Sequence, residues 1–71
     1  MKPEKLIYMA NQIATFFESQ PEATRVEGCA AHIRDFWDPR MRAQLFEILE
    51  GGSEGLRPVA RQAAESLRAE V

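Results

Sequence analysis

The positions of proline and glycine constrain this chain more strongly than any other sequence feature, because both residues interrupt regular secondary structure. The interruptions lie at Pro3, Pro21, Pro39, Gly51, Gly52, Gly55 and Pro58. Between them, apolar residues recur at the three- and four-residue spacing of a helix, and no alternating run typical of a strand occurs. The sequence therefore predicts an all-α fold.

We predict a single small helical domain over residues 1–71, built as a bundle of three to four short helices. The helices are expected at 3–19, 22–37, 39–50 and 58–69, with a flexible connector at 51–57. A chain of this length buries only about 60% of its unfolded surface, and such domains usually need a disulfide, a metal or a partner. Because Cys29 is the single cysteine, a partner surface is the expected source of additional stability.

Each predicted helix carries an apolar stripe. The four stripes are Leu6, Met9, Ala10, Ile13, Phe16 and Phe17; Val26, Cys29, Ala30, Ile33, Phe36 and Trp37; Met41, Leu45, Ile48 and Leu49; and Ala60, Ala63, Ala64 and Leu67. With Ile7 and Ala14 included, the first apolar sector is about 160° wide, more than the roughly 100° that a small bundle requires. The last is mostly alanine, so we expect the helix at 58–69 to pack weakly or to dock mainly on another chain.

The dipeptide Asp38-Pro39 predicts a sharp corner between two helices. A residue before proline is pushed out of the helical region, so Asp38 ends the preceding helix. Its carboxylate is also a favoured N-cap, and Pro39 suits the first helical position, where its missing N–H has no cost. At the far end of the same helix, Gly51 is expected to provide a left-handed stop.

Capping does not account for the arginines and aromatic residues around this corner. Trp37 precedes the cap and is expected to stack on the guanidinium of Arg42. Tryptophan and arginine are also enriched at interface hot spots. The predicted partner-interface residues are Tyr8, Asn11, Gln12, Trp37, Arg40, Arg42 and Phe46. In the alternative interpretation, Trp37 is an ordinary core residue and the arginines are simply solvated.

Composition argues against several other classes of protein. The net charge of −2 and the lack of a basic stripe argue against nucleic-acid binding. The longest apolar run is far shorter than a membrane span, and Asn11 and Gln12 interrupt the apolar segment near the start, unlike a signal peptide. We expect no membrane partner and a cytoplasmic location, where a single free thiol is common.

The sequence also predicts no catalytic residues, no cofactor-binding residues, no metal ligands and no small-molecule substrate for this chain. Cys29, His32 and Asp35 lie one helical turn apart, but a Cys-His nucleophile needs an oriented third group and a cleft. Two or three candidate ligands also fall short of a closed zinc shell. A small redox or metal protein built on Cys29 and His32 is the corresponding alternative.

Two blocks of sequence resemble a known family. "KLIYMANQIATFF" (Lys5 to Phe17) and "HIRDFWDPRMR" (His32 to Arg42) are similar to segments of the delta subunit of cytosolic NAD-dependent formate dehydrogenases. The blocks carry the family's Met-Ala-Asn-Gln-Ile and Phe-Trp-Asp-Pro-Arg-Met-Arg motifs, whereas the tail from Gly51 onward is generic. The motif positions for which we expect a role are Asn11, Gln12, Trp37, Asp38, Pro39, Arg40 and Arg42.

The resemblance implies membership of a multi-subunit complex that oxidises formate and reduces NAD. Its large subunit carries a molybdenum or tungsten bis-pterin cofactor and iron–sulfur clusters, and other subunits carry FMN and further clusters. The expected function of this chain is that of a non-catalytic small subunit that docks on and stabilises the large catalytic subunit and supports full activity. The alternatives are a transient assembly chaperone for cofactor insertion and an unrelated small helical adaptor or regulator.

Overall fold

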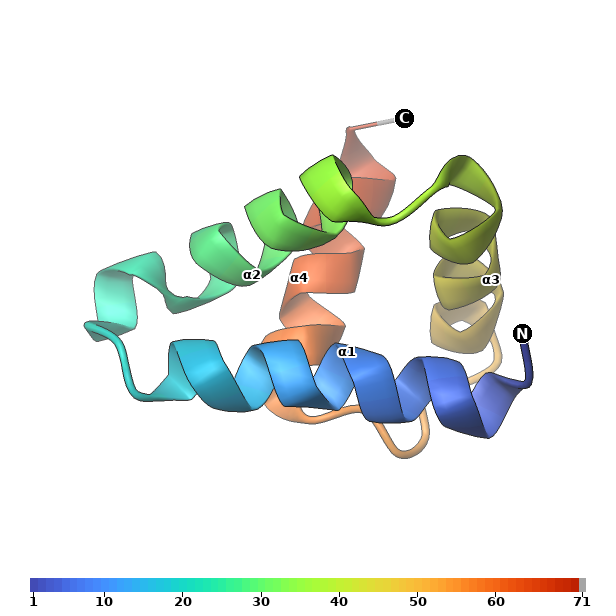
Figure 1. Ribbon diagram of the computed structural model, residues 1–71, viewed down its shortest axis with the longest axis horizontal. Coiled ribbons are helices and arrows are strands. Elements are labelled where there is room, and N and C mark those ends of the chain that lie inside the picture. Colours follow the sequence, from blue (N-terminus) through green and yellow to red (C-terminus); the bar gives the residue numbers. More distant parts are fainter. Residues whose placement is uncertain (71) are drawn as a thin grey trace.

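The computed structural model of this protein describes residues 1–70, and these residues form four helices (Figure 1). The helices are α1 (Pro3–Glu18), α2 (Glu22–Phe36), α3 (Pro39–Glu50) and α4 (Pro58–Ala69). No strand is present in the described part of the chain, so the all-α prediction is confirmed. None of the helices within residues 1–70 has the length and apolar character needed to cross a membrane.

Proline determines where most of the helices begin. It occupies the first helical position of α1, α3 and α4, where its missing N–H leaves no hydrogen bond unmade. Pro21 lies one residue earlier, as the N-cap of α2. The predicted C-terminal ends of the first two helices are one residue too late, because Ser19 and Trp37 are the C-caps of α1 and α2.

Helix α3 ends at Glu50 as predicted, but the left-handed glycine that follows it lies one position later than expected. Gly51 has a φ of −78°, whereas Gly52 has a φ of 116° and takes the left-handed position. The amide of Ser53 donates to the carbonyl of Ile48 (2.9 Å) and the amide of Gly52 to that of Leu49 (3.2 Å). This is the hydrogen-bond pattern of a Schellman motif, which satisfies the last carbonyls of the helix. The prediction of a glycine stop is right in kind but wrong by one position.

Helix α4 is the central element of the bundle. In Figure 1, α2 lies above α1, and α3 stands near the N-terminal end of α1. Helix α4 runs behind α1 and α2 in the middle of the view. α4 packs most extensively against α2, and it also contacts α1 and α3. Ala60, Ala63 and Ala64 are completely buried. The expected weak packing of this helix is therefore wrong, because small side chains let neighbouring helices approach closely.

The core contains residues from all four helices and from the corner between α2 and α3. Its buried members are Leu6, Ala10, Ala14, Cys29, Ala30, Ile33, Trp37, Leu45, Leu49, Ala60, Ala63, Ala64 and Leu67. Two aromatic residues of the predicted stripes lie outside it, since Phe16 is 60% exposed and Phe36 is 75% exposed. Both were assigned to apolar stripes by helical spacing alone, which does not show how much of a stripe the neighbouring helices cover.

Candidate functional site

The corner between α2 and α3 is built by Asp38 and Pro39. Asp38 has extended backbone angles, and its Oδ1 accepts a hydrogen bond from the amide of Met41 at 2.8 Å. Its backbone carbonyl accepts the first helical bond, from the amide of Arg42. Pro39 follows as the first residue of α3. The carboxylate therefore satisfies one of the free amides at the start of α3.

Trp37 and Arg42 brace this corner from inside the chain. The indole of Trp37 is only 5% exposed and belongs to the core. The sequence predicts that the Arg42 guanidinium stacks on this indole, whereas in the structure its Nη1 donates to the backbone carbonyls of Trp37 and Arg34. These carbonyls are at the C-terminal end of α2, where helical partners are missing. A direct contact of either group with another protein stays a prediction; Trp37 is buried, whereas Arg42 is half-buried.

Arg40 and Phe46 are the predicted interface residues of this region with accessible side chains. Arg40 is exposed and makes no hydrogen bond or ion pair within residues 1–70. Phe46 is half-buried against the core. Together with Arg34, Arg42, Leu67 and Glu70, Phe46 lines a small groove of about 210 Å³.

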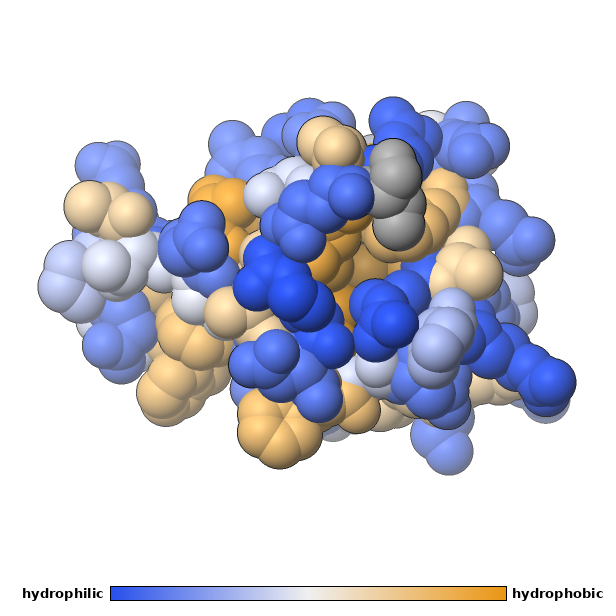
Figure 2. Space-filling view, turned by 90° about the horizontal axis from the view of Figure 1, so that it is seen from above, coloured by the Kyte–Doolittle hydropathy of each residue, from blue (hydrophilic) through white to orange (hydrophobic). Residues whose placement is uncertain are grey.

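The ion pair between Arg34 and Glu70 lies at this small groove. The Arg34 guanidinium donates to both carboxylate oxygens of Glu70, at 3.1 and 2.6 Å. This pair connects α2 to the end of α4 and lowers the pKa of the Glu70 carboxyl. Figure 2, the view from above, shows apolar surface exposed between strongly hydrophilic side chains on this face. Two of the charges near the corner therefore already neutralise each other.

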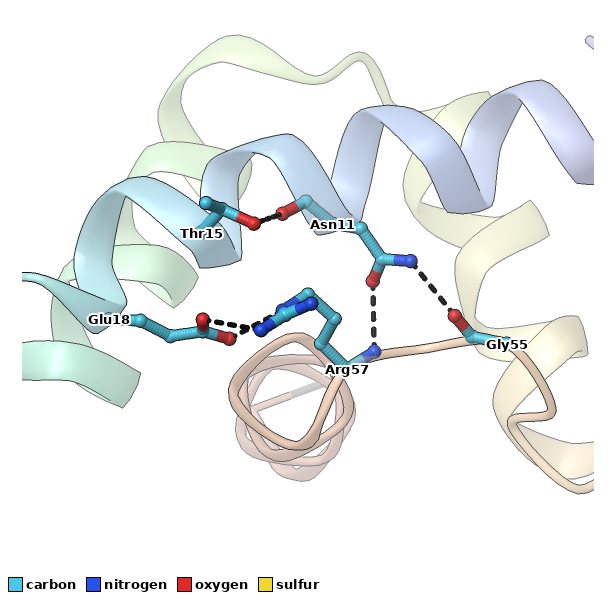
Figure 3. Close-up of polar contacts among 5 residues, drawn as sticks. All are labelled: Asn11, Thr15, Glu18, Gly55 and Arg57. Atoms are coloured by element: carbon cyan, nitrogen blue, oxygen red, sulfur yellow. Dashed lines mark hydrogen bonds and ion pairs between the residues drawn. The ribbon is translucent and has the colours of Figure 1, made fainter.

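Asn11 connects α1 to the connector that precedes α4 (Figure 3). Its Nδ2 donates to the carbonyl of Gly55 at 2.8 Å, and its Oδ1 accepts from the amide of Arg57 at 2.9 Å. A single side chain thus binds both a donor and an acceptor of the connector backbone. Gly55 has a φ of 90°, a left-handed value that suits glycine. The motif position Asn11 is therefore used within the chain, and it fixes a segment that the sequence predicts to be flexible.

Arg57 and Glu18 extend this connection toward the end of α1. The Arg57 guanidinium donates to both carboxylate oxygens of Glu18, at 2.7 and 2.8 Å (Figure 3). These hydrogen bonds lower the pKa of the Glu18 carboxyl below its ordinary value, with desolvation acting in the opposite direction. We name the four residues Asn11, Glu18, Gly55 and Arg57 the connector clamp. Glu18 and Arg57 could not be identified as partners from the sequence, because their pairing depends on how α1 and α4 approach each other.

Tyr8 and Gln12 lie on the outer side of α1. Tyr8 is 62% exposed, and its hydroxyl accepts a hydrogen bond from Nε2 of Gln12 at 3.1 Å. Both side chains line a shallow groove of about 380 Å³ together with Asn11, Thr15 and Arg57. The structure therefore brings Tyr8, Asn11 and Gln12 together, but it separates them from the groove that contains Arg42 and Phe46.

A third groove lies between α1 and α2 and contains residues that the sequence analysis did not assign to an interface. It has a volume of about 470 Å³ and is lined by Gln12, Ile13, Phe16, Phe17 and His32. The rings of Phe16 and Phe17 meet edge to face at 5.0 Å. The width of the first apolar stripe was the available signal for this exposed surface.

His32 joins the exposed ring of Phe36 to the same groove. The two rings lie 4.7 Å apart between centroids and are inclined by 32°. They are one helical turn apart on α2, so the stacked pair extends the groove wall. Their exposure could not be derived from helical spacing, which places Phe36 on the core stripe.

The residues suggested for redox or metal chemistry lie in very different surroundings. The Cys29 side chain is completely buried, and burial raises the pKa of its thiol to about 11. At neutral pH this thiol stays protonated, and a protonated thiol is a poor nucleophile and a poor metal ligand. His32 is exposed on the surface. Within residues 1–70, no three His, Cys, Asp or Glu side chains come close enough together to hold a metal ion.

Comparison with known proteins gives one family match. Residues 5–64 match the model of the family described as NADH-dependent formate dehydrogenase delta subunit FdsD. The matched residues include both sequence blocks, the connector and most of α4, so the match extends well beyond the two motifs. No curated protein and no solved structure matches the chain.

Proposed function

Because the chain belongs to the family of NADH-dependent formate dehydrogenase delta subunits, we propose that it is the non-catalytic small subunit of such a complex. In this role it docks on the large molybdenum or tungsten bis-pterin subunit, stabilises it and supports full activity. The observation that carries the proposal is the family match over residues 5–64. The family's name describes a subunit of formate dehydrogenase, which supports a role as a component of an oxidoreductase complex.

The surface of the chain supports a binding role. Phe16 and Phe36 are 60% and 75% exposed, although a bundle of this size has few large apolar side chains to bury. Contiguous exposed apolar patches mark protein interaction sites, and aromatic residues are enriched at interfaces relative to the rest of the protein surface. Burial of these side chains against another subunit would add the apolar contact that a small core lacks.

We further propose that this chain holds none of the complex's cofactors. Its residues do not fit a bis-pterin metal or an iron–sulfur cluster, which is bound through several thiolates. The single cysteine, Cys29, is buried with its thiol protonated at neutral pH. The molybdenum or tungsten centre, the iron–sulfur clusters, the FMN and the NAD site are accordingly assigned to the other subunits.

A tagged version of the full chain, purified gently from its native cells, tests the proposal. The eluate is analysed by mass spectrometry for subunit stoichiometry and assayed for formate-dependent reduction of NAD. A permanent subunit is expected to recover the large catalytic subunit at equal stoichiometry together with activity. Recovery of only traces, increasing when the cells are starved of molybdenum, would instead indicate a transient chaperone for cofactor insertion. Complete absence of the large subunit would refute both roles.

A further inference from the structure

We propose that this chain docks on the large catalytic subunit through the exposed side of α1 and the groove between α1 and α2. The inference rests on the proposed function and identifies the surface that performs it. We define the docking face by Tyr8, Gln12, Ile13, Phe16, His32 and Phe36. The partner is inferred to supply an uncharged segment whose apolar side chains fill the groove.

The first support is the distribution of charge. Residues 6–17 form the longest stretch of the chain without Asp, Glu, Lys or Arg, although Tyr8, Gln12 and Phe16 in this stretch are exposed to solvent. Helices α2, α3 and α4 each carry both acidic and basic side chains. The centres of protein interfaces are depleted of charged residues and enriched in aromatic ones. The outer side of α1 has this composition and the other helices do not.

The second support is the shape of this surface. Gln12 lines both the groove with Tyr8 and the groove with Phe16. The exposed residues of α1 therefore form a ridge that has a groove along each side. A helix or extended segment can pack beside such a ridge with its own side chains in the grooves, as in ordinary helix packing. His32 and Phe36 prolong the apolar wall of one groove along α2.

The third support is the use of the other candidate residues inside the chain. Trp37 is buried, and Arg42 binds the carbonyls at the end of α2. Asn11 holds the connector. Arg34 and Glu70 pair with each other beside Phe46. The corner thus has few free groups for a partner, whereas Phe16 and Phe36 of the docking face keep most of their surface exposed.

The family match indicates a heterologous partner rather than a second copy of this chain, because a delta subunit is one component of a multi-subunit enzyme. A phenylalanine side chain contributes about 150–250 Å² of surface, so the exposed parts of Phe16 and Phe36 amount to roughly 270 Å². This suits the apolar centre of a standard interface, which buries about 800 Å² on each partner. A permanent interface, in a hetero-complex as in a homodimer, buries about 1,000 Å² or more per subunit, and this area is over a fifth of the chain's 4552 Å² surface.

Binding of matched variants to the complex tests the docking face. The complex is produced without this chain and immobilised, and full-length wild-type chain is titrated onto it by biolayer interferometry. Phe16→Gln and Phe36→Gln are each expected to weaken binding at least tenfold, as hot-spot changes do. Glu65→Gln, at an exposed position of α4, is the matched control and is expected to leave affinity within twofold. Circular dichroism checks that each variant folds. If Phe16→Gln does not fold, Phe36→Gln alone tests the docking face.

The outcomes separate this inference from the proposed function. If the wild-type chain binds and both phenylalanine variants bind equally well, the docking face is wrong while the subunit role stands. If Arg40→Ala alone weakens binding, the corner is the contact. If the wild-type chain does not bind at all, the proposed function fails and the docking face with it. Light scattering is expected to show a monomeric free chain; a dimer abolished by Phe36→Gln would overturn the assigned partner.

Discussion

Replacement of Asn11 by alanine is the most informative single change that the structure suggests. The substitution removes the donor to the Gly55 carbonyl and the acceptor from the Arg57 amide at the same time. Both bonds join segments more than forty residues apart in the sequence, with separations of 44 and 46. Their loss should therefore loosen the connector from α1 while leaving each helix able to form.

The expected magnitude follows from the number and exposure of these bonds. A hydrogen bond contributes about 0.5–1.5 kcal/mol net, and the lower half applies here because water can replace the exposed partners. The two bonds together account for about 1.5 kcal/mol. Alanine is a better helix former than asparagine by about 0.5 kcal/mol, which offsets part of the loss. We expect Asn11→Ala to lower the free energy of unfolding by about 1 kcal/mol.

Thermal unfolding followed by circular dichroism measures this change. For a domain of this size, a loss of 1 kcal/mol lowers the Tm by about 4–8 °C. Gln12→Ala is the matched control, because Gln12 is the next residue of α1 and bonds only to Tyr8 in the same helix. Its effect should stay within about 0.5 kcal/mol, as for other surface changes. Hydrogen exchange gives a local readout, since the Arg57 amide should exchange faster in Asn11→Ala than in the control.

A specific result would refute this reasoning. If Asn11→Ala and Gln12→Ala unfold at the same temperature and the Arg57 amide keeps its protection, the clamp contributes nothing to stability. The match of Asn11 to the family motif would then require a partner contact after all. If stability falls but the Arg57 amide is unaffected, the loss must come from elsewhere in α1.

Three further predictions concern single residues of the fold. Asp38→Ala is expected to lower the unfolding free energy by about 1 kcal/mol through the lost cap, and an unchanged urea midpoint would contradict this. Glu18 has its pKa lowered in the fold by the Arg57 guanidinium, so its pair adds stability above the ordinary value of 4.5 that is lost as the pH falls through the lower folded value. The Tm difference between wild type and Glu18→Gln should thus shrink on acidification; a gap independent of pH would disprove the linkage. A Cβ at Gly28 would lie 2.5 Å from the Phe17 ring, so Gly28→Ala should destabilise by about 1 kcal/mol, the overpacking exceeding the gain of about 1 kcal/mol in helix propensity. In a Phe17→Ala background the same change should become stabilising, as a double-mutant cycle by urea denaturation will show.

The sequence by itself determined the helices and their ends, because these depend on interactions between residues close together in the chain. Proline fixes the backbone angle at the start of a helix, and an aspartate carboxylate reaches an amide three residues away. The Asp38-Pro39 corner and the glycine stop after α3 follow from such local chemistry, with the stop misplaced from Gly52 to Gly51. The two ends of each helix were therefore predictable to within about one residue.

Only the tertiary structure decided which apolar residues are covered. Phe16 and Phe36 have the same spacing as buried residues of their helices, yet they lie at the surface. Coverage depends on the crossing of the helices, and α4, with its alanines, takes the centre of the bundle. An alanine side chain buries little apolar area, but it allows two helices to approach closely. The periodicity of apolar residues does not show which helix will pack most closely against the others.

The same distinction holds for the candidate site. The sequence identified Asn11 and Arg42 as positions that need an explanation, and the structure explains both by contacts within the chain. The partners of Asn11 and of Glu18 lie in the connector, and their meeting requires α1 and α4 to be packed together first. Residue types and spacing determine what a segment can form locally. The packing of the helices against one another determines which side chains remain exposed for contact with another protein.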